Sequence, residues 1–144
     1  LYVVRSELEG LAARLAARHA TEEEVRFLRE MVEEDKALID DPAALARTNR
    51  RFHRQVHLAS HNRFLVQQLD LVYRSMALMA TTSLAAEGRS EVALAEHEAI
   101  VEAIAAHDGE AAAGKLKAHI SRAFEARLRQ DAEEAARHDQ PVAE

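Results

Sequence analysis

Polar side chains with the chemistry of metal ligands recur on apolar helix faces in this 144-residue chain. Asn49 and His53 are four residues apart, so in a helix they lie on one face, and Phe52 beside His53 directs that face inward. His97 and His119 also fall on the apolar sides of their segments. A buried polar group without a partner costs roughly 1–3 kcal/mol, so these side chains need partners. A metal site is the most specific explanation.

Three imidazoles and one amide oxygen suit a borderline divalent ion such as Zn²⁺ or Ni²⁺. The chain has no cysteine, so any metal must be held by nitrogen and oxygen. Three protein nitrogens would leave coordination positions open for water or for an anionic ligand. The alternative is that each histidine is a core residue, hydrogen-bonded to a backbone carbonyl or to water. The spacing by itself does not decide between the two.

The other histidines need no special explanation at this level. His57 shares a side of its segment with His53, but we place it near the solvent edge. His19 and His138 fall at helix C-termini, where a partly charged imidazole suits the helix dipole. On the inner faces we identify no carboxylate beside the three inward histidines that could act as a general base.

Hydrophobic periodicity predicts helices along almost the whole chain. Thr21 followed by Glu24 is a capping-box pattern, and Asp41, Ser90 and Asp108 are further N-cap candidates. The predicted helices cover residues 3–19, 22–39, 42–59, 63–84, 91–107 and 110–137. In the first of them the expected inner stripe is Leu8, Leu11, Ala12, Leu15 and Ala16. Short connections between these segments imply an all-α fold, an antiparallel six-helix bundle.

The composition supports the same fold class and excludes several functions. The chain has only four Gly and two Pro, as expected of a nearly all-helical domain. No apolar stretch approaches the roughly 18 residues of a membrane span, and without an export signal we expect a cytoplasmic protein. The net charge of −6 argues against direct binding of this segment to a nucleic-acid backbone.

The chemistry-bearing residues belong to an ordered series of short motifs. The series resembles the FCD domain, the ligand-sensing C-terminal domain of FadR-type GntR transcription regulators. The similarity runs from about residue 2 to residue 128, and six helices are more similar to the VanR-type branch than to the seven-helix FadR type. The motifs that carry it are Asn49-Arg50-Arg51-Phe52-His53, Ser60-His61-Asn62, Glu96-His97, Ile104-Ala105-Ala106-His107-Asp108 and His119, together with the opening segment from Val4 to Ala17.

The resemblance implies a helical FCD-like domain over residues 1–138, followed by a polar tail at 139–144. Many FCD domains hold a divalent metal with one Asp and three His. The matching histidines are His53, His97 and His119, whereas Asn49 occupies the position of the Asp. Asparagine is neutral and a weaker donor, so a metal here would keep its full +2 charge. That charge should weaken retention of the metal and strengthen its attraction for an anionic effector.

The implied function is effector sensing for transcription regulation, not enzyme catalysis. FCD domains sense small organic acids, commonly carboxylates. We expect Arg74 to be a second carboxylate anchor, with Asn49, Tyr73 and Thr82 lining the same pocket. The resemblance further implies a homodimer. It also implies contact with DNA only through a winged helix-turn-helix domain, which is absent from this chain.

Two other classes of function remain open in the sequence. One is a helical metal-dependent phosphohydrolase, since His107-Asp108 is the kind of adjacent pair that such enzymes use. Asp108 is, however, equally well placed to cap the next helix. The other is a metal-free helical interaction module in which the histidines are structural.

Overall fold

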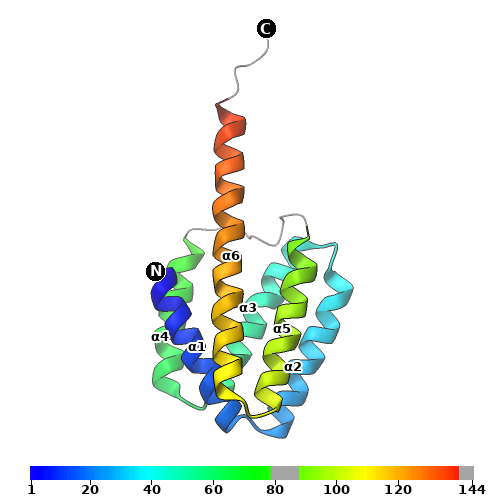
Figure 1. The fold of residues 1–144 in the computed structure, drawn as a ribbon, viewed down its shortest axis with the longest axis vertical. Coiled ribbons are helices and arrows are strands. Elements are labelled where there is room, and N and C mark those ends of the chain that lie inside the picture. The colour runs from blue at the N-terminus through cyan, green and yellow to red at the C-terminus, as the bar shows by residue number, and fades with distance from the viewer. Residues whose placement is uncertain (79–87, 140–144) are drawn as a thin grey trace.

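Six α-helices and no strand make up the part of the chain that the structure describes, residues 1–78 and 88–139 of a computed structural model (Figure 1). The all-α prediction is therefore confirmed. The helices are α1 (Tyr2–His19), α2 (Glu22–Asp35), α3 (Pro42–Ala59), α4 (Arg63–Ala77), α5 (Arg89–Ala105) and α6 (Gly109–His138), with a short 3-10 helix, η1 (Lys36–Leu38), after α2.

Successive helices run in opposite directions, as expected of an antiparallel bundle (Figure 1). Helix α6 lies along α1 and α5, and its C-terminal half extends beyond the rest of the bundle. The start of α6 lies against the backbone of α1, since a Cβ atom added to Gly109 would be 3.3 Å from the carbonyl oxygen of Arg14. A Cβ atom added to the buried Gly10 of α1 would lie 2.5 Å from Cε of Lys117 on α6.

The helix starts follow local side-chain chemistry. The Thr21 hydroxyl accepts a hydrogen bond from the Glu24 amide at 3.1 Å, and the Glu24 carboxylate accepts one from the Thr21 amide, which completes the predicted capping box. Asp41 and Asp108 each accept a hydrogen bond from a backbone N–H of the first helical turn, at 3.1 and 3.0 Å. Each cap satisfies a donor that the helix itself cannot, and this fixes where the helix begins.

Some predicted boundaries are wrong. The second helix ends at Asp35 and continues as η1, instead of running unbroken to residue 39. Helix α5 begins at Arg89 with Gly88 as its N-cap, so the buried Ser90 is an early helical residue and not the cap. Gly88 has φ of +71°, a left-handed conformation that glycine adopts readily because it has no side chain. Helix α4 ends at Ala77, and residues 79–84 of its predicted span lie outside the described residues.

The main core lies between α1, α2, α3, α5 and α6, with α4 joined to α1 by a smaller apolar cluster. On α1 the predicted inner stripe is confirmed at Ala12 and Ala16, which have no exposed surface, and is wrong at Leu11, which is 37% exposed. The residues buried on that helix are Arg5, Glu9, Gly10, Ala12, Ala13, Ala16 and Ala17. A charged pair therefore enters the interior on an otherwise small-residue face.

Within the described ranges, 1–78 and 88–139, every helix is too short or too polar to cross a lipid bilayer.

Candidate metal and effector site

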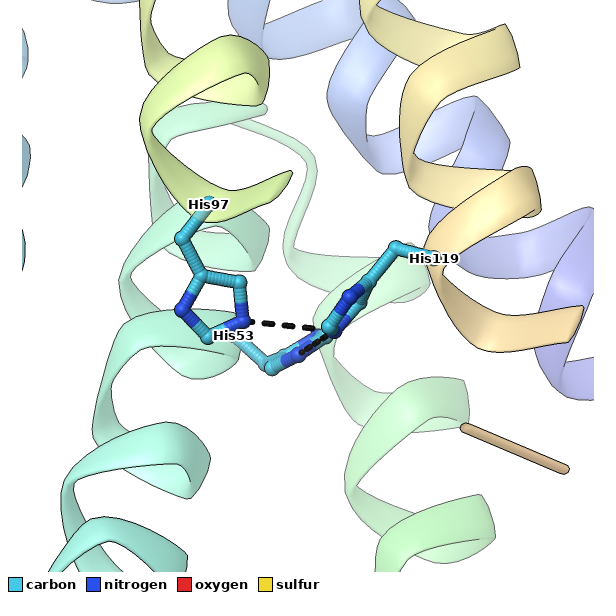
Figure 2. Close-up of side chains that lie close together, drawn as sticks. All are labelled: His53, His97 and His119. Atoms are coloured by element: carbon cyan, nitrogen blue, oxygen red, sulfur yellow. Dashed lines mark hydrogen bonds between the residues drawn. The ribbon is translucent and has the colours of Figure 1, made fainter. Parts of the chain in front are cut away.

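Three histidines from three helices meet in the interior of the bundle. His53 on α3, His97 on α5 and His119 on α6 are each at most 3% exposed. Nε2 of His119 lies 3.3 Å from Nε2 of His53 and 3.2 Å from Nε2 of His97, so the three rings point at one another (Figure 2). Hydrophobic periodicity correctly predicted that all three would be buried.

The spacing of these nitrogens fits a metal ion. Two nitrogens that are each about 2.0–2.1 Å from a tetrahedral zinc ion lie about 3.3 Å apart. The observed separations of 3.2 and 3.3 Å match that value, and one nitrogen from each ring lies within 4.8 Å of the others. His53, His97 and His119 are thus the residues that would hold a divalent ion.

Burial also favours the uncharged form that a metal ligand needs. Desolvation lowers the pKa of His53 to about 4, although the neighbouring Glu9 opposes the shift. Desolvation, together with the other two rings, lowers the pKa of His97 well below its usual range. A neutral imidazole keeps one nitrogen lone pair, which is the group that binds a metal.

A buried carboxylate that the sequence analysis missed stands behind His53. Oε1 of Glu9 lies 2.9 Å from Nδ1 of His53 and 2.8 Å from Nε2 of His57. The Tyr73 hydroxyl donates a hydrogen bond to the same oxygen at 2.6 Å. Nε of Arg5 donates to the other oxygen, Oε2, at 3.0 Å. Glu9 has no exposed surface, and four donors surround its carboxylate.

The charges in this network are balanced. Burial alone would raise the pKa of Glu9, but His53, Arg5 and the hydrogen bonds hold it well below its usual range. Since His53 is neutral at pH 7, Arg5 supplies the opposing charge there. Burial and the adjacent Glu9 raise the pKa of Tyr73 well above its usual value, so its phenol keeps the proton that it donates.

Two predictions about this region are wrong. His57 is not near the solvent edge: it is 2% exposed and bonded to Glu9. A carboxylate does accompany the inward histidines, since Glu9 lies against His53. The signal was present in the sequence, because Arg5, Glu9, Ala12 and Ala16 share one face of a helix. The neighbouring leucines suggested a different inner face.

A second carboxylate lies behind His119. Nδ1 of His119 is 3.4 Å from Oε1 of Glu96 and 3.5 Å from Nη2 of Arg89. Arg89 donates to Glu96 at 2.6 Å, and Arg122 donates to the other carboxylate oxygen. Burial would raise the pKa of Glu96, but the hydrogen bonds from His119, Arg122 and Arg89 lower it to about 2.

The outer nitrogen of His97, Nδ1, has no hydrogen-bond partner among the described residues. His97 also lines a cavity of about 10 Å³, roughly the room that one water molecule needs. Asn49 and the buried Asp35 are on the wall of the same cavity. The structure therefore brings Asn49, the predicted fourth ligand, to a cavity beside His97.

The other predicted residues lie further from the three rings. Tyr73 reaches the site through Glu9, whereas Arg74, its neighbour in the last turn of α4, is exposed. Thr82 lies outside the described residues. His107 donates from Nδ1 to the carbonyl of Ala17 at 2.9 Å, which gives it a structural role at the bundle end.

A model of the FCD domain family matches residues 1–122. The chain therefore belongs to the FCD domain family, the effector-binding domains of GntR-type transcription regulators. The predicted resemblance is confirmed, and the class of protein is a regulator domain and not an enzyme. The phosphohydrolase alternative is accordingly wrong, and Asp108 of its His-Asp pair is the cap of α6.

Two relatives illustrate the similarity. The uncharacterized HTH-type transcriptional regulator YdhC of Bacillus subtilis is 31% identical over 124 residues, which are 84% of this chain and 55% of the relative. The HTH-type transcriptional repressor NanR of Escherichia coli K12 is 30% identical over 120 residues, which are 82% of this chain and 46% of NanR. The chain thus spans about half the length of the curated relatives that it matches.

Solved structures of the same fold include Escherichia coli McbR/YncC, with a TM-score of 0.76 and 18% identity over 88% of this chain and 65% of the other. Streptococcus agalactiae GntR has a TM-score of 0.71 and 23% identity over 83% of this chain and 54% of the other. At these identities the likeness concerns the fold alone.

Proposed function

We propose that this domain senses a small organic acid for a GntR-type transcription regulator and that His53, His97 and His119 hold a divalent metal, zinc or nickel, at the sensing site. The observation that carries the proposal is the convergence of three Nε2 atoms from three helices. Nε2 of His119 lies 3.3 Å from that of His53 and 3.2 Å from that of His97. The membership of the FCD family supports the sensing role.

One choice of histidine tautomers leaves two ring nitrogens facing each other without a proton between them. If Nδ1 of His53 donates to Glu9, its Nε2 carries a lone pair that faces Nε2 of His119. If Nδ1 of His119 donates to Glu96, a second lone pair faces the first. Two lone pairs at 3.3 Å repel each other, and a bound cation would remove that repulsion. The ion, when bound, would supply a positive charge and open coordination positions to an anionic ligand.

The effector that fits this site best is a small carboxylate. With Asn49 in place of an acidic residue, the protein would supply three imidazole nitrogens and no negatively charged ligand at position 49. A carboxylate from solution would neutralise part of the ion's charge. We propose that Asn49 and Tyr73 contact this effector from the cavity beside His97 and from the Glu9 network. Arg74 as a second carboxylate anchor and Thr82 as a residue lining the same pocket stay predictions.

Regulation would require a partner domain and a second copy of the chain. The relatives carry helix-turn-helix names, and the matched segment is only 55% and 46% of their length, which supports contact with DNA through another part of the protein. A homodimer is supported by exposed apolar residues seven apart along α4 and its C-cap, Phe64, Leu71 and Leu78. An effector that binds one bundle arrangement better would then shift the relative pose of two DNA-binding parts.

The decisive experiment measures metal content and metal affinity. We expect about one zinc or nickel ion per chain in the purified protein. His97→Ala and His119→Ala should each weaken binding by more than about 100-fold, because each removes a direct ligand. His19→Ala is the matched control, since His19 is exposed at the end of α1, and it should bind as the wild type does.

Calorimetry with citrate and other small organic acids then tests the sensing role. Binding should require the metal, so protein stripped by a chelator and the His119→Ala variant should both lose it. A wild-type chain that takes up no ion after soaking in zinc or nickel would refute the metal proposal. The histidines would then be hydrogen-bonding residues of a metal-free effector pocket. Equal effector affinity with and without metal would refute the proposed contact between effector and ion.

A further inference from the structure

We infer that Glu9 is a positioning residue for the site: it holds His53 as the tautomer with the proton on Nδ1, so that the lone pair on Nε2 points at His97 and His119. The inference deepens the proposed function, on which its metal-affinity test rests. The family match and the metal proposal say nothing of a role for this carboxylate on α1.

The first step in the argument is the direction of the hydrogen bond. An ionised carboxylate can only accept, so Nδ1 of His53, 2.9 Å from Glu9, must carry the proton. A neutral imidazole has a single N–H, and Nε2 of His53 is then left with its lone pair. With the proton on Nε2 instead, the lone pair of Nδ1 would face the carboxylate oxygen, which is repulsive in an interior with few compensating charges.

The second step is that the carboxylate is itself firmly held. Arg5 donates to one of its oxygens at 3.0 Å, and His57 and Tyr73 donate to the other at 2.8 and 2.6 Å. The donors come from α1, α3 and α4, so three helices fix the position of one side chain. Glu9 therefore orients the His53 ring and does not merely follow it.

The third step excludes a second metal ion as the better explanation. Glu9, His53 and His57 also place one ligand atom each within 4.8 Å of one another. The Arg5 guanidinium, however, already supplies the positive charge that balances Glu9. An ion in this position would stand beside that buried cation and displace the hydrogen bond from Tyr73. The group is better explained as support for His53.

The first test needs no metal. Nitrogen-proton correlations of the imidazole rings in chelator-treated protein distinguish the two histidine tautomers. We expect His53 with its proton on Nδ1 in the wild type and a change in that pattern in Glu9→Gln, because a neutral amide holds this tautomer less strongly. A wild-type His53 with its proton on Nε2 would overturn the inference, whatever the variants do.

The second test is metal affinity. Glu9→Gln should weaken binding of zinc by about 10- to 100-fold, the usual effect of removing a group that orients a metal ligand. Glu7→Gln is the matched control: it removes a carboxylate from the same helix at an exposed position, where Glu7 pairs with Lys117, and should leave the affinity unchanged. Unchanged affinity in a folded Glu9→Gln variant would contradict the inference.

Tyr73→Phe separates a specific role of Glu9 from general damage to the network. It removes one of the four donors to the carboxylate and leaves the Glu9–His53 hydrogen bond in place. His53 should therefore keep the tautomer that it has in the wild type, and the zinc affinity should fall by less than it does in Glu9→Gln. If Tyr73→Phe weakened zinc as much as Glu9→Gln does, the effect would belong to the network and not to Glu9. If the wild type binds no zinc, the proposed metal site fails, while the tautomer of His53 still decides the role of Glu9.

Discussion

Two glutamates carry negative charge into the interior of this bundle, and each is paired with arginine. Glu9 and Glu96 each accept hydrogen bonds from at least one arginine and each lie against one of the clustered histidines. An unpaired buried charge would cost several kcal/mol, so a carboxylate can lie beside a buried histidine ring only when an arginine balances its charge. The result is a site in which His53 and His97 are neutral and Glu9 and Glu96 are ionised at pH 7.

The lowered pKa of His53 predicts a loss of stability in acid. The unfolded chain takes up a proton near pH 6.5, whereas the folded chain does so only near pH 4. Between these values the unfolded state binds more protons, so the free energy of unfolding falls as the pH falls. The contribution of His53 is about 3 kcal/mol over this range. Urea unfolding of the metal-free domain at pH 7, 5.5 and 4 measures it.

His53→Gln is the comparison for this prediction, because glutamine cannot titrate in the same range. Its unfolding free energy should depend less steeply on pH than that of the wild type between pH 6.5 and pH 4. His19→Gln, at an exposed position, should keep the wild-type slope. Parallel slopes for the wild type and His53→Gln would show that His53 is not the group responsible.

At the scale of helices, α1 is the element that ties the site to the bundle. It packs against α3, α4, α5 and α6, and it supplies both Arg5 and Glu9. Gly10 on its buried face lies against the side chain of Lys117 on α6.

Two glycine-to-alanine substitutions should separate the effect of helix propensity on stability from the effect of close packing. Gly114→Ala in α6 should raise the free energy of unfolding by about 0.5–1 kcal/mol, because alanine is the better helix former and a Cβ there meets no atom within 4 Å. Gly10→Ala in α1 should gain less or lose stability, since its Cβ would lie 2.5 Å from Cε of Lys117. Chemical denaturation of both variants measures the difference.

The Lys117→Ala background tests the reason for that difference. Removing the lysine removes the contact, so Gly10→Ala should then gain about as much as Gly114→Ala does. A Gly10→Ala variant that gains the full amount with Lys117 present would mean that the lysine moves aside without cost.

At the scale of the whole molecule, the exposed apolar surface matters as much as the buried site. Three large apolar side chains spaced seven residues apart are exposed: Phe64 at 66%, Leu71 at 59% and Leu78 at 89%. Contact of such a patch with water is unfavourable, and exposed apolar patches often mark interaction sites. Helix α4 also carries Tyr73, which bonds to Glu9. A partner on this face would therefore touch a helix that reaches the sensing site.

If the domain dimerises through this face of α4, one charged residue placed there should disrupt the dimer. Leu71→Glu should shift the domain to a monomer in sedimentation velocity, because a carboxylate buried at the interface would be unpaired. Circular dichroism should be unchanged, since the position is exposed in the single chain. Val92→Glu on α5, at a residue that is 47% exposed, is the control and should leave the dimer intact. A wild-type monomer at the same concentrations would refute the dimer.

Much of the architecture could be predicted from local patterns. The helices, the caps at Thr21, Asp41 and Asp108, and the burial of His53, His97 and His119 all follow from periodicity and from side chains within a few residues of one another. Such features depend on the chain's own backbone geometry, so they can be read without knowing how helices pack.

The contacts of Glu9 could not be predicted in this way. Its partners His53, His57 and Tyr73 are 44, 48 and 64 residues away along the chain. Whether Glu9 meets them depends on how far α1 is rotated about its axis and on its register against α3 and α4. Periodicity leaves both open when leucines and alanines lie on adjacent faces, as they do in α1. The tertiary packing decided it: the buried face of α1 includes Gly10 and four alanines, and Glu9 lies on that face against His53 and His57.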